Sequence, residues 1–234
     1  MLILIKGLTE EEKYKVLRPI IGNYEEDKYH MPIINKADIK SVNWNKLNII
    51  SFKSVSKNKT LSNSIVLMFN YDKDLMRLWN NPLKYVPKYQ TAAFVATPDF
   101  SVYPNMHPNE LQHNVFKGRW IGKTWQNYGC KVIPTIPWAT PDTYDLCFTG
   151  IEKGSAVIIS TIGCQNNAEM FLNGFNEMKK RINPELIIVY GDMIQGMTGR
   201  FVNYKYEDAF SRKHSYQQLK LFDNEPIFTI KEEA

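Results

Sequence analysis

The sequence predicts an α/β fold with a mostly parallel sheet built from βαβ units, forming an open sheet or an incomplete β/α barrel. Four short runs are predominantly apolar on both alternations, which is typical of strands covered on two faces: Ala92–Ala96, Val132–Ile136, Ala156–Thr161 and Leu186–Tyr190. Helical patterns separate these runs, whose starts lie about 24 to 40 residues apart, the size of a βαβ unit. Right-handed crossovers would make the four strands parallel neighbours in one sheet.

Length and composition favour one globular domain. With 234 residues, of which 44% are hydrophobic and 23% charged, the chain can bury a sizeable core. No repeat, low-complexity tract or linker stands out in the sequence. We therefore expect a single α/β domain, 1–234, with an irregular N-terminal part (1–90), a βαβ core (91–196) and a basic-aromatic C-terminal extension (197–234).

Charge, cysteine content and hydropathy limit the setting of the protein. The net charge of +5 permits contact with a polyanion but does not require it. Three well-separated cysteines without a CxxC pair argue against a disulfide framework or a zinc knuckle, and favour a reducing cytosol. The start, MLILIKGL, is too short for a membrane span and lacks the features of a signal peptide. We expect a cytoplasmic protein without a membrane partner.

Short elements are predicted in the first 90 residues. Thr9 and Glu12 fit a capping box that begins a helix ending at Leu17. No clear period follows between residues 23 and 48, where we expect loops and short elements. Two strands and a brief helix come next, at Asn48–Lys53, Ser64–Asn70 and Asp72–Trp79.

Helices are predicted between the strands of the core. The longest spans Pro108–Tyr128 and ends at Gly129. A short helix begins at Thr140 and runs to about Phe148. A third helix follows a capping box that begins at Asn166. Beyond the core, the C-terminal extension is expected to add one strand and one helix.

Several motifs of the core occur together in a known order. They are PDFS at 98–101, GKTWQNYG at 122–129, VIPTIPW at 132–138, STIG at 160–163 and VYG at 189–191. In this order they resemble an uncharacterised bacterial and phage family, the domain of unknown function number 4417, which is often found on mobile elements. The resemblance covers roughly residues 86–196. The family has no agreed activity, so the resemblance implies a phage or mobile-element setting and no mechanism.

Polar and aromatic side chains follow each of the four core strands. Pro98 cannot donate to a sheet ladder, so the first strand should stop there and leave Asp99 on the following loop. Ligands of α/β folds bind at this end of the strands, because the loops converge over the sheet. The predicted site collects Asp99, Ser101, Trp138, Thr140, Thr161, Cys164, Tyr190 and Asp192.

Two carboxylates and an aromatic platform would suit acid–base chemistry on a polar ligand. Asp99 would act as general base or nucleophile, Asp192 as its partner, and Trp138 would position the ligand. The alternative is that both aspartates only cap helices or hold turns, where aspartate is common. For Trp138 the alternative is a core tryptophan, which is the commoner case.

Other chemistries have weaker support in the sequence. Cys164 lies near a helix start and could pair with His107, although an inert buried cysteine is the commoner case. The cofactor is unknown: no metal motif is present, and Mg²⁺ held by Asp99 and Asp192 through substrate phosphates stays an alternative. Arg200 ends a glycine-spaced loop that could fold over the cleft and bind an anion, or could be a plain surface turn.

Two basic stretches could bind nucleic acid. The long helix carries Lys117, Arg119 and Lys123, and the C-terminal extension carries Lys205, Arg212 and Lys213 among tyrosines and a phenylalanine. Aromatic residues interleaved with basic ones are typical of surfaces for single strands. No helix-turn-helix, zinc-finger or RNP pattern supports this, and a charged helix face is usually only solvated.

Three functions follow as hypotheses. The first is a phage- or mobile-element-borne enzyme, such as a hydrolase, that acts on a nucleotide, a nucleic acid or another phosphorylated ligand. The second is a non-catalytic nucleic-acid-binding or replication-linked protein. The third is a protein-interaction module such as a host-defence antagonist. An enzyme should gather polar groups in one pocket, whereas a nucleic-acid binder should show a continuous basic stripe.

Overall fold

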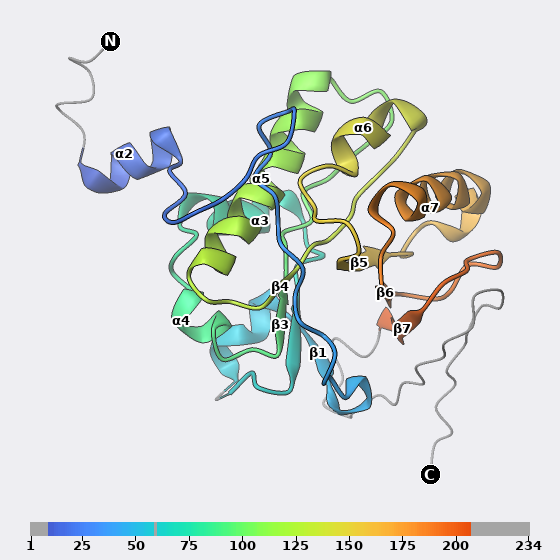
Figure 1. The fold of residues 1–234 in the computed structure, drawn as a ribbon, viewed down its shortest axis with the longest axis horizontal. Helices are drawn as coiled ribbons and strands as arrows, with labels where there is room; N and C mark the ends of the chain where they lie inside the picture. The colour runs from blue at the N-terminus through green and yellow to red at the C-terminus, as the bar shows by residue number, and fades with distance from the viewer. Residues whose placement is uncertain (1–8, 59, 207–234) are drawn as a thin grey trace.

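Seven parallel strands form the centre of the protein and confirm the predicted α/β fold (Figure 1). The computed structural model describes residues 9–58 and 60–206. The strands of this part are β1 (Asn48–Ser51), β2 (Ser64–Leu67), β3 (Phe94–Ala96), β4 (Val132–Ile133), β5 (Ala156–Ser160), β6 (Leu186–Tyr190) and β7 (Phe201–Tyr204). β1 to β4 form one sheet and β5 to β7 another, and every strand lies next to its neighbours in the sequence.

The two sheets meet between β4 and β5. Thr135 and Ile158 form a single parallel bridge there. The amide of Ile136 donates to the carbonyl of Ile158, and the amide of Ile158 donates to the carbonyl of Pro134, both at 2.9 Å. Pro134 has no amide hydrogen, so the ladder of β4 is interrupted after two residues. The four core strands are therefore parallel and in the predicted order, but the prediction of one sheet is wrong, because the hydrogen-bonded ladders are divided between two sheets.

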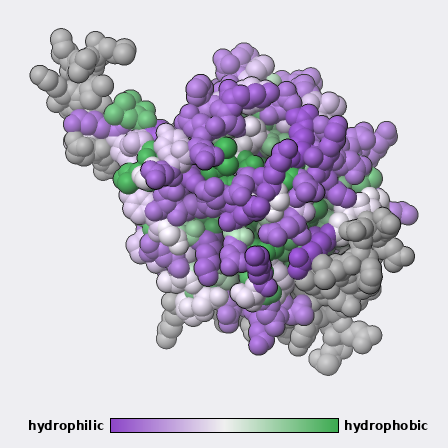
Figure 2. Space-filling view, viewed as in Figure 1, coloured by the Kyte–Doolittle hydropathy of each residue, from purple (hydrophilic) through white to green (hydrophobic). Residues whose placement is uncertain are grey.

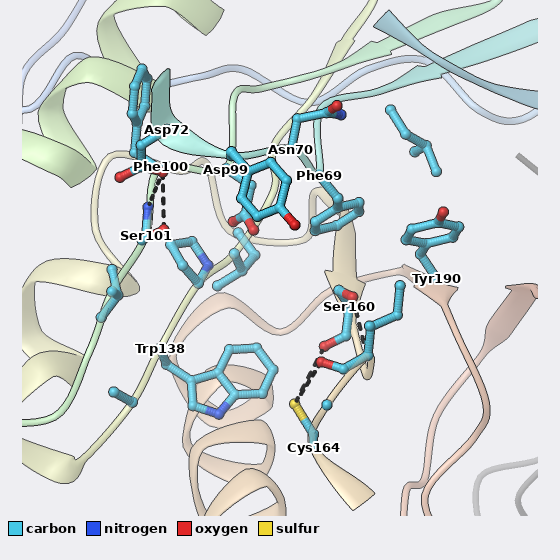
Figure 3. Close-up of a pocket in the computed structure, with 18 of the residues that line it drawn as sticks. Phe69, Asn70, Asp72, Asp99, Phe100, Ser101, Trp138, Ser160, Cys164 and Tyr190 are labelled. Carbon is cyan, nitrogen blue, oxygen red and sulfur yellow. Dashed lines mark hydrogen bonds between the residues drawn. The ribbon is translucent and has the colours of Figure 1, made fainter. Parts of the chain in front are cut away.

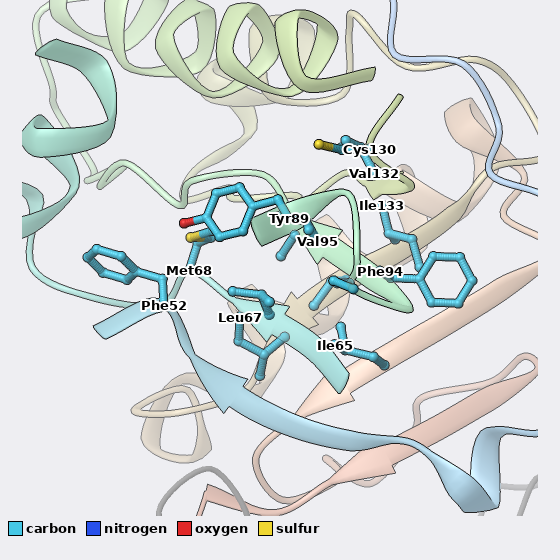
Figure 4. Close-up of a cluster of buried hydrophobic side chains, with 14 of the residues drawn as sticks. Phe52, Ile65, Leu67, Met68, Tyr89, Phe94, Val95, Cys130, Val132 and Ile133 are labelled. Atoms are coloured by element: carbon cyan, nitrogen blue, oxygen red, sulfur yellow. The ribbon is translucent and has the colours of Figure 1, made fainter. Parts of the chain in front are cut away.

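The second sheet has one face toward the first sheet and one toward α7 (Ala168–Ile182). Ile158, Ile188 and Val202 belong to the hydrophobic core of β1–β4, part of which Figure 4 shows. The alternate side chains Val157 and Ile187 pack instead in the core that contains residues of α7. Strands in sequential order around a shared interior have the arrangement of an incomplete β/α barrel.

The edges of the barrel come close at β1 and β7. The hydroxyl of Tyr204, at the end of β7, donates to the carbonyl of Leu47, which directly precedes β1, at 3.5 Å. No pairing between β1 and β7 occurs in the described residues. The barrel is therefore open between β1 and β7. The hydrogen bond from the Tyr204 side chain connects the two edges there in place of a strand ladder.

The helices largely follow the predicted positions. They are α2 (Glu10–Leu17), α3 (Asp72–Asn80), α4 (Val86–Tyr89), α5 (Pro108–Asn127), α6 (Tyr144–Cys147) and α7. Thr9 and Glu12 form the predicted capping box of α2. The predicted cap of α7 is wrong, because Asn166 lies in a 3₁₀ turn at Gln165–Asn167 and the helix begins after it. None of the helices described is long and apolar enough to cross a membrane.

Arg119 of α5 is a buried cation that connects three parts of the fold. Its side chain is 1% exposed. The guanidinium donates to the main-chain carbonyls of Thr149 at 2.9 Å, Thr135 at 3.1 Å and Cys147 at 2.8 Å. Burial lowers the pKa of Arg119 to about 10. The forked guanidinium thus holds α5, the end of β4 and the end of α6 together, because no shorter donor reaches three carbonyls at once.

Candidate functional site

A cavity of about 830 Å³ opens at the carboxyl ends of the strands (Figure 3). Its lining comes mainly from the segments that follow β1 to β5 and β7, together with the end of β6 and the start of α7. A cavity of this size suits a small organic ligand. Its position at the carboxyl edge of parallel strands is the usual place for ligand sites in α/β folds.

The cavity brings together five residues of the predicted site. Asp99, Ser101, Trp138, Cys164 and Tyr190 line it. Four other predicted residues lie outside the lining in the described part of the chain, namely Thr140, Thr161, Asp192 and Arg200. The strand-end argument therefore located the cavity but not the direction of every side chain.

The four residues outside the cavity have local positions that explain their absence from it. Thr161 is buried and directs its hydroxyl toward the carbonyl of Tyr190 at 3.5 Å. Thr140 accepts the hydroxyl hydrogen of Thr143 through its main-chain carbonyl at 2.7 Å. Asp192 is exposed to solvent. Arg200 directly precedes β7, so it lies at the amino end of a parallel strand, opposite to the cavity.

Asp99 supplies a half-buried carboxyl group to the cavity. Its Oδ1 atom is shielded from solvent and has no hydrogen-bond partner among the described residues. Burial and, to a lesser extent, the nearby charge of Asp72 raise the pKa of Asp99 to about 7, although the buried charge of Arg119 opposes both. A carboxyl group that titrates near neutrality can both donate and accept a proton, which is the requirement for a general acid–base.

Asp72 is a second carboxylate of the cavity, which the sequence analysis missed. It is the first residue of α3, and its Oδ1 accepts hydrogen bonds from the amide and the hydroxyl of Ser101 at 3.1 and 2.9 Å. Figure 3 shows these two bonds beside Asp99. The segment that follows β2 carries Asp72 just as the segment that follows β3 carries Asp99, so the strand-end rule applied to β2 would have found it. The carboxylate neighbour of Asp99 in the cavity is Asp72 rather than Asp192.

Aromatic rings form much of the remaining wall. Phe69 and Tyr190 stack at 5.3 Å between ring centroids with an interplanar angle of 17°. Trp138, on the opposite side in Figure 3, packs against Phe171 at 5.0 Å. Trp138 is half-buried, so part of its indole remains available to a ligand. The cavity therefore combines flat apolar surfaces with two carboxyl groups.

Gly174 of α7 provides the space that Trp138 occupies. A Cβ atom at this position would lie 2.2 Å from Cδ1 and 2.3 Å from Nε1 of the indole. Non-bonded contacts of a Cβ atom this short essentially never occur in proteins, so a side chain on Gly174 must displace the ring. The position of the tryptophan in the cavity wall thus depends on a glycine of the facing helix.

Gly174→Ala is therefore expected to destabilise the protein by about 1–3 kcal/mol, the usual cost of overpacking. The free energy of unfolding from urea titration measures this. In a Trp138→Ala background the same substitution should cost less, because the clash is gone and alanine favours a helix. An equal cost in both backgrounds would show that Gly174 does not act through Trp138.

Cys164 lines the cavity as a thiol. Its Sγ donates to the carbonyls of Ser160 and Ile162 at 4.0 and 3.8 Å. Burial raises the pKa of the Cys164 thiol, with a further contribution from Asp99. The structure does not bring His107 to it: His107 caps α5 by accepting the amide hydrogen of Asn109 at 3.3 Å and does not line the cavity. A raised pKa also argues against the thiolate that a nucleophile requires.

The basic stripe expected on the long helix is not on the surface. Lys117, Arg119 and Lys123 are 7%, 1% and 4% exposed. Lys117 lies over the ring of Phe100 at 4.2 Å, and Lys123 donates to the side chain of Asn35. These interactions bury all three charges within the fold, so the helix offers no basic stripe to a polyanion. Lys205 is exposed, and Arg212 and Lys213 lie outside the described residues.

Metal ligands are sparse. No three histidine, cysteine, aspartate or glutamate side chains converge in the part of the chain that the structure describes. The expected pair for Mg²⁺, Asp99 and Asp192, is not assembled at the cavity, because Asp192 lies outside its lining. Asp72 and Asp99 are the two carboxylates of the described lining, a number that Mg²⁺ sites commonly take from the protein beside water and substrate phosphates.

A protein-family model described as "Domain of unknown function (DUF4417)" matches residues 24–207. The chain belongs to the DUF4417 family. Every described strand and the whole cavity lining lie within the matched residues. The carboxyl-end cavity is therefore a feature of the part of this DUF4417 chain that defines its family membership.

Two relatives of this DUF4417 protein come from phages. The Gene 1 protein of Mycobacterium phage L5 is 40% identical over 118 residues, which cover 49% of this chain and 52% of the relative. The Gene 1 protein of Mycobacterium phage D29 is 38% identical over 117 residues, which cover 49% and 43%. The chain spans about half the length of these curated relatives, which support a phage origin. No solved structure matches.

Proposed function

We propose that this DUF4417 protein is an enzyme that binds a nucleobase-containing ligand in the carboxyl-end cavity and uses Asp99 as general acid or base. The observation that carries the proposal is the Asp99 carboxyl group, whose Oδ1 is shielded and unpartnered among the described residues. Its pKa of about 7 suits proton transfer near neutral pH. A carboxyl group kept only for structure would normally have its oxygens paired.

The walls of the cavity favour a flat, uncharged moiety. Trp138 and the Phe69–Tyr190 pair offer ring surfaces against which a nucleobase can stack. Lys53 is the only lysine or arginine in the described lining, and its Nζ lies 2.5 Å from a carboxylate oxygen of Asp74. Two carboxylates in the lining would repel a phosphate group. The base of a nucleoside or nucleotide therefore fits inside, and any phosphate is expected to lie outside.

The free cysteines and the burial of the basic residues of α5 agree with this proposal. All three cysteines are free thiols, as expected for a protein that works in the reducing cytoplasm of a phage host. The buried basic residues of α5 count against a purely electrostatic nucleic-acid binder, because its charges have to face solvent. The cavity supports the catalytic hypothesis instead, with the ligand held by stacking and by the carboxyl groups.

The test is a carbon-detected NMR titration of aspartate carboxyl groups in the full chain. The Asp99→Asn variant identifies the Asp99 signal by its loss. We expect this signal to titrate near pH 7 and to shift when adenosine, guanosine, cytidine or uridine is added, since one of these bases should enter the cavity. Ribose 5-phosphate, which has no base, is the control and should leave the signal unchanged. Titration near pH 4, or a signal that no nucleoside shifts, contradicts the proposal.

A further inference from the structure

Exposed large hydrophobic side chains gather at the mouth of the cavity. Of the nine in the described residues, four lie at the N-terminal arm around α2 (Val16, Leu17, Ile21 and Tyr24), and five line the cavity: Tyr71, Tyr103, Ile162, Met170 and Tyr206. The rest of the visible surface is mostly hydrophilic (Figure 2). Apolar side chains that converge around a cavity from separate segments indicate a ligand that extends beyond it. We refer to these five residues as the cavity rim.

Three of the five rim residues are tyrosines, and they are the most exposed ones. Tyr71 is 76%, Tyr103 is 61% and Tyr206 is 51% exposed. Each comes from a different segment, after β2, after β3 and after β7 respectively. Exposed tyrosines on separate loops offer ring faces to several flat groups at once. A mononucleotide within the cavity would leave these rings uncovered.

Two lysines near the mouth lie outside the cavity lining, whereas Lys53 within it is paired with Asp74. Lys73 is exposed, and its Nζ lies 5.6 Å from the ring centroid of Tyr71. Lys205 is exposed and directly precedes Tyr206. The interior instead carries the carboxyl groups of Asp72 and Asp99. This distribution suits a ligand whose uncharged rings point inward and whose negative charges follow its outer edge.

We propose that the ligand is single-stranded nucleic acid, with one base in the cavity and the neighbouring bases stacked on Tyr71, Tyr103 and Tyr206. The inference rests on the proposed function and deepens it, because it makes the nucleobase part of a polymer. Stacking on tyrosine is tolerant of sequence, since every base has a flat face. Lys73 and Lys205 then lie where the phosphates of the strand leave the cavity. A duplex is excluded, because its bases are stacked on one another and cannot reach the rings.

The experiment measures fluorescence anisotropy of a labelled eight-nucleotide single strand with the full chain. Tyr71→Ala and Tyr103→Ala are the test variants. Their main chains keep the hydrogen bonds that the carbonyls of these tyrosines accept from the amides of Asp74 and Met106. Tyr24→Ala is the matched control, because Tyr24 is 41% exposed but does not line the cavity. Thermal melts check that each variant is folded.

We expect the single strand to bind more tightly than the corresponding nucleoside monophosphate and than a duplex of the same sequence. Each rim substitution should weaken binding of the strand about tenfold or more, and by a larger factor than it weakens binding of the monophosphate. Tyr24→Ala should have no effect. Higher salt should weaken binding of the strand, because phosphates near Lys73 release counterions.

Several results overturn the inference, and they separate it from the proposed function. If the monophosphate binds as tightly as the strand, or if the rim variants bind the strand normally, the inference of a polymeric ligand is wrong. The proposal of an enzyme that binds a nucleobase is unaffected by either result. Loss of binding to strand and monophosphate alike removes both. Equal binding of duplex and single strand assigns the contact to charge alone. Self-association of the wild type that the rim substitutions abolish, measured by analytical ultracentrifugation, assigns the rim to a second copy of the chain.

Discussion

Replacing Asp99 with asparagine is expected to reduce turnover of the nucleobase ligand by about a hundredfold or more, while the protein stays folded. The amide has nearly the same shape as the carboxyl group, but it cannot accept or deliver a proton. Steady-state kinetics at pH 7 and a thermal melt of both proteins measure the two effects. Asp192→Asn is the matched control and should have normal turnover, because Asp192 is exposed and lies outside the cavity lining.

The same variant should also alter how stability depends on pH. The folded state raises the pKa of Asp99 from 3.8 to about 7, so it binds this proton more tightly than the unfolded chain does. This group therefore lowers the free energy of unfolding as the pH rises from about 4 to about 7, by at most roughly 4 kcal/mol. Asp99→Asn removes this decrease. The variant should gain stability relative to wild type over that interval, with a constant difference above it.

Two outcomes would contradict this prediction. Full turnover in Asp99→Asn with normal melting would remove Asp99 from the chemistry. A difference in stability that does not change between pH 4 and pH 8 would show that the carboxyl group ionises as in solvent. The second outcome is informative without any known substrate, because urea titrations at several pH values are sufficient.

Arg119→Ala is expected to destabilise the protein by about 3–5 kcal/mol, which is enough to unfold many proteins of this size. The substitution leaves the carbonyls of Thr149, Thr135 and Cys147 without their donor and opens a void in the protein interior. Arg119→Lys should recover only part of the loss, because an ammonium group cannot reproduce the fork. Urea denaturation at pH 7 measures the differences.

Arg77→Ala is the surface control for this substitution. The Arg77 side chain is 57% exposed and lies 3.9 Å from Asp74 in an ion pair that solvent screens. Its loss should change the free energy of unfolding by less than about 1 kcal/mol. If Arg119→Ala proved as mild as Arg77→Ala, the three carbonyls would have found other partners and the guanidinium would not be needed to hold α5 in place.

The fold was predictable because its main signals are local. Residues 156–160 and 186–190 are apolar at nearly every position, which identifies strands buried on both faces without knowledge of their partners. The interruption of β4 was also present in the sequence as Pro134. The division into two sheets was not, because it depends on how far the strands curl around a common interior.

The location of the site was predictable from the sequence, but only some of the residues that form it were. A strand end locates a residue, whereas the direction of its side chain depends on the turn that follows, as Asp99 and Asp192 illustrate. Arg200 lies directly before β7, at the amino end of that strand. The sequence alone does not show at which residue the loop has crossed from the carboxyl edge of the sheet to the amino edge. Burial of charges was the hardest feature to foresee. The partners of Arg119 are main-chain carbonyls, which every residue carries and which therefore leave no trace in the sequence.

The order of the strands determines when the cavity can exist. Within each sheet, every strand pairs with the one made just before it, so a chain leaving the ribosome can extend the sheets in the order of its synthesis. The cavity wall does not follow this order, because Phe69 stacks on Tyr190, a residue of the sixth strand. A nascent chain can thus acquire most of its sheet while the ligand site is still incomplete. The proposed ligand can bind only after Tyr190 has been made, so shorter nascent chains cannot compete for it.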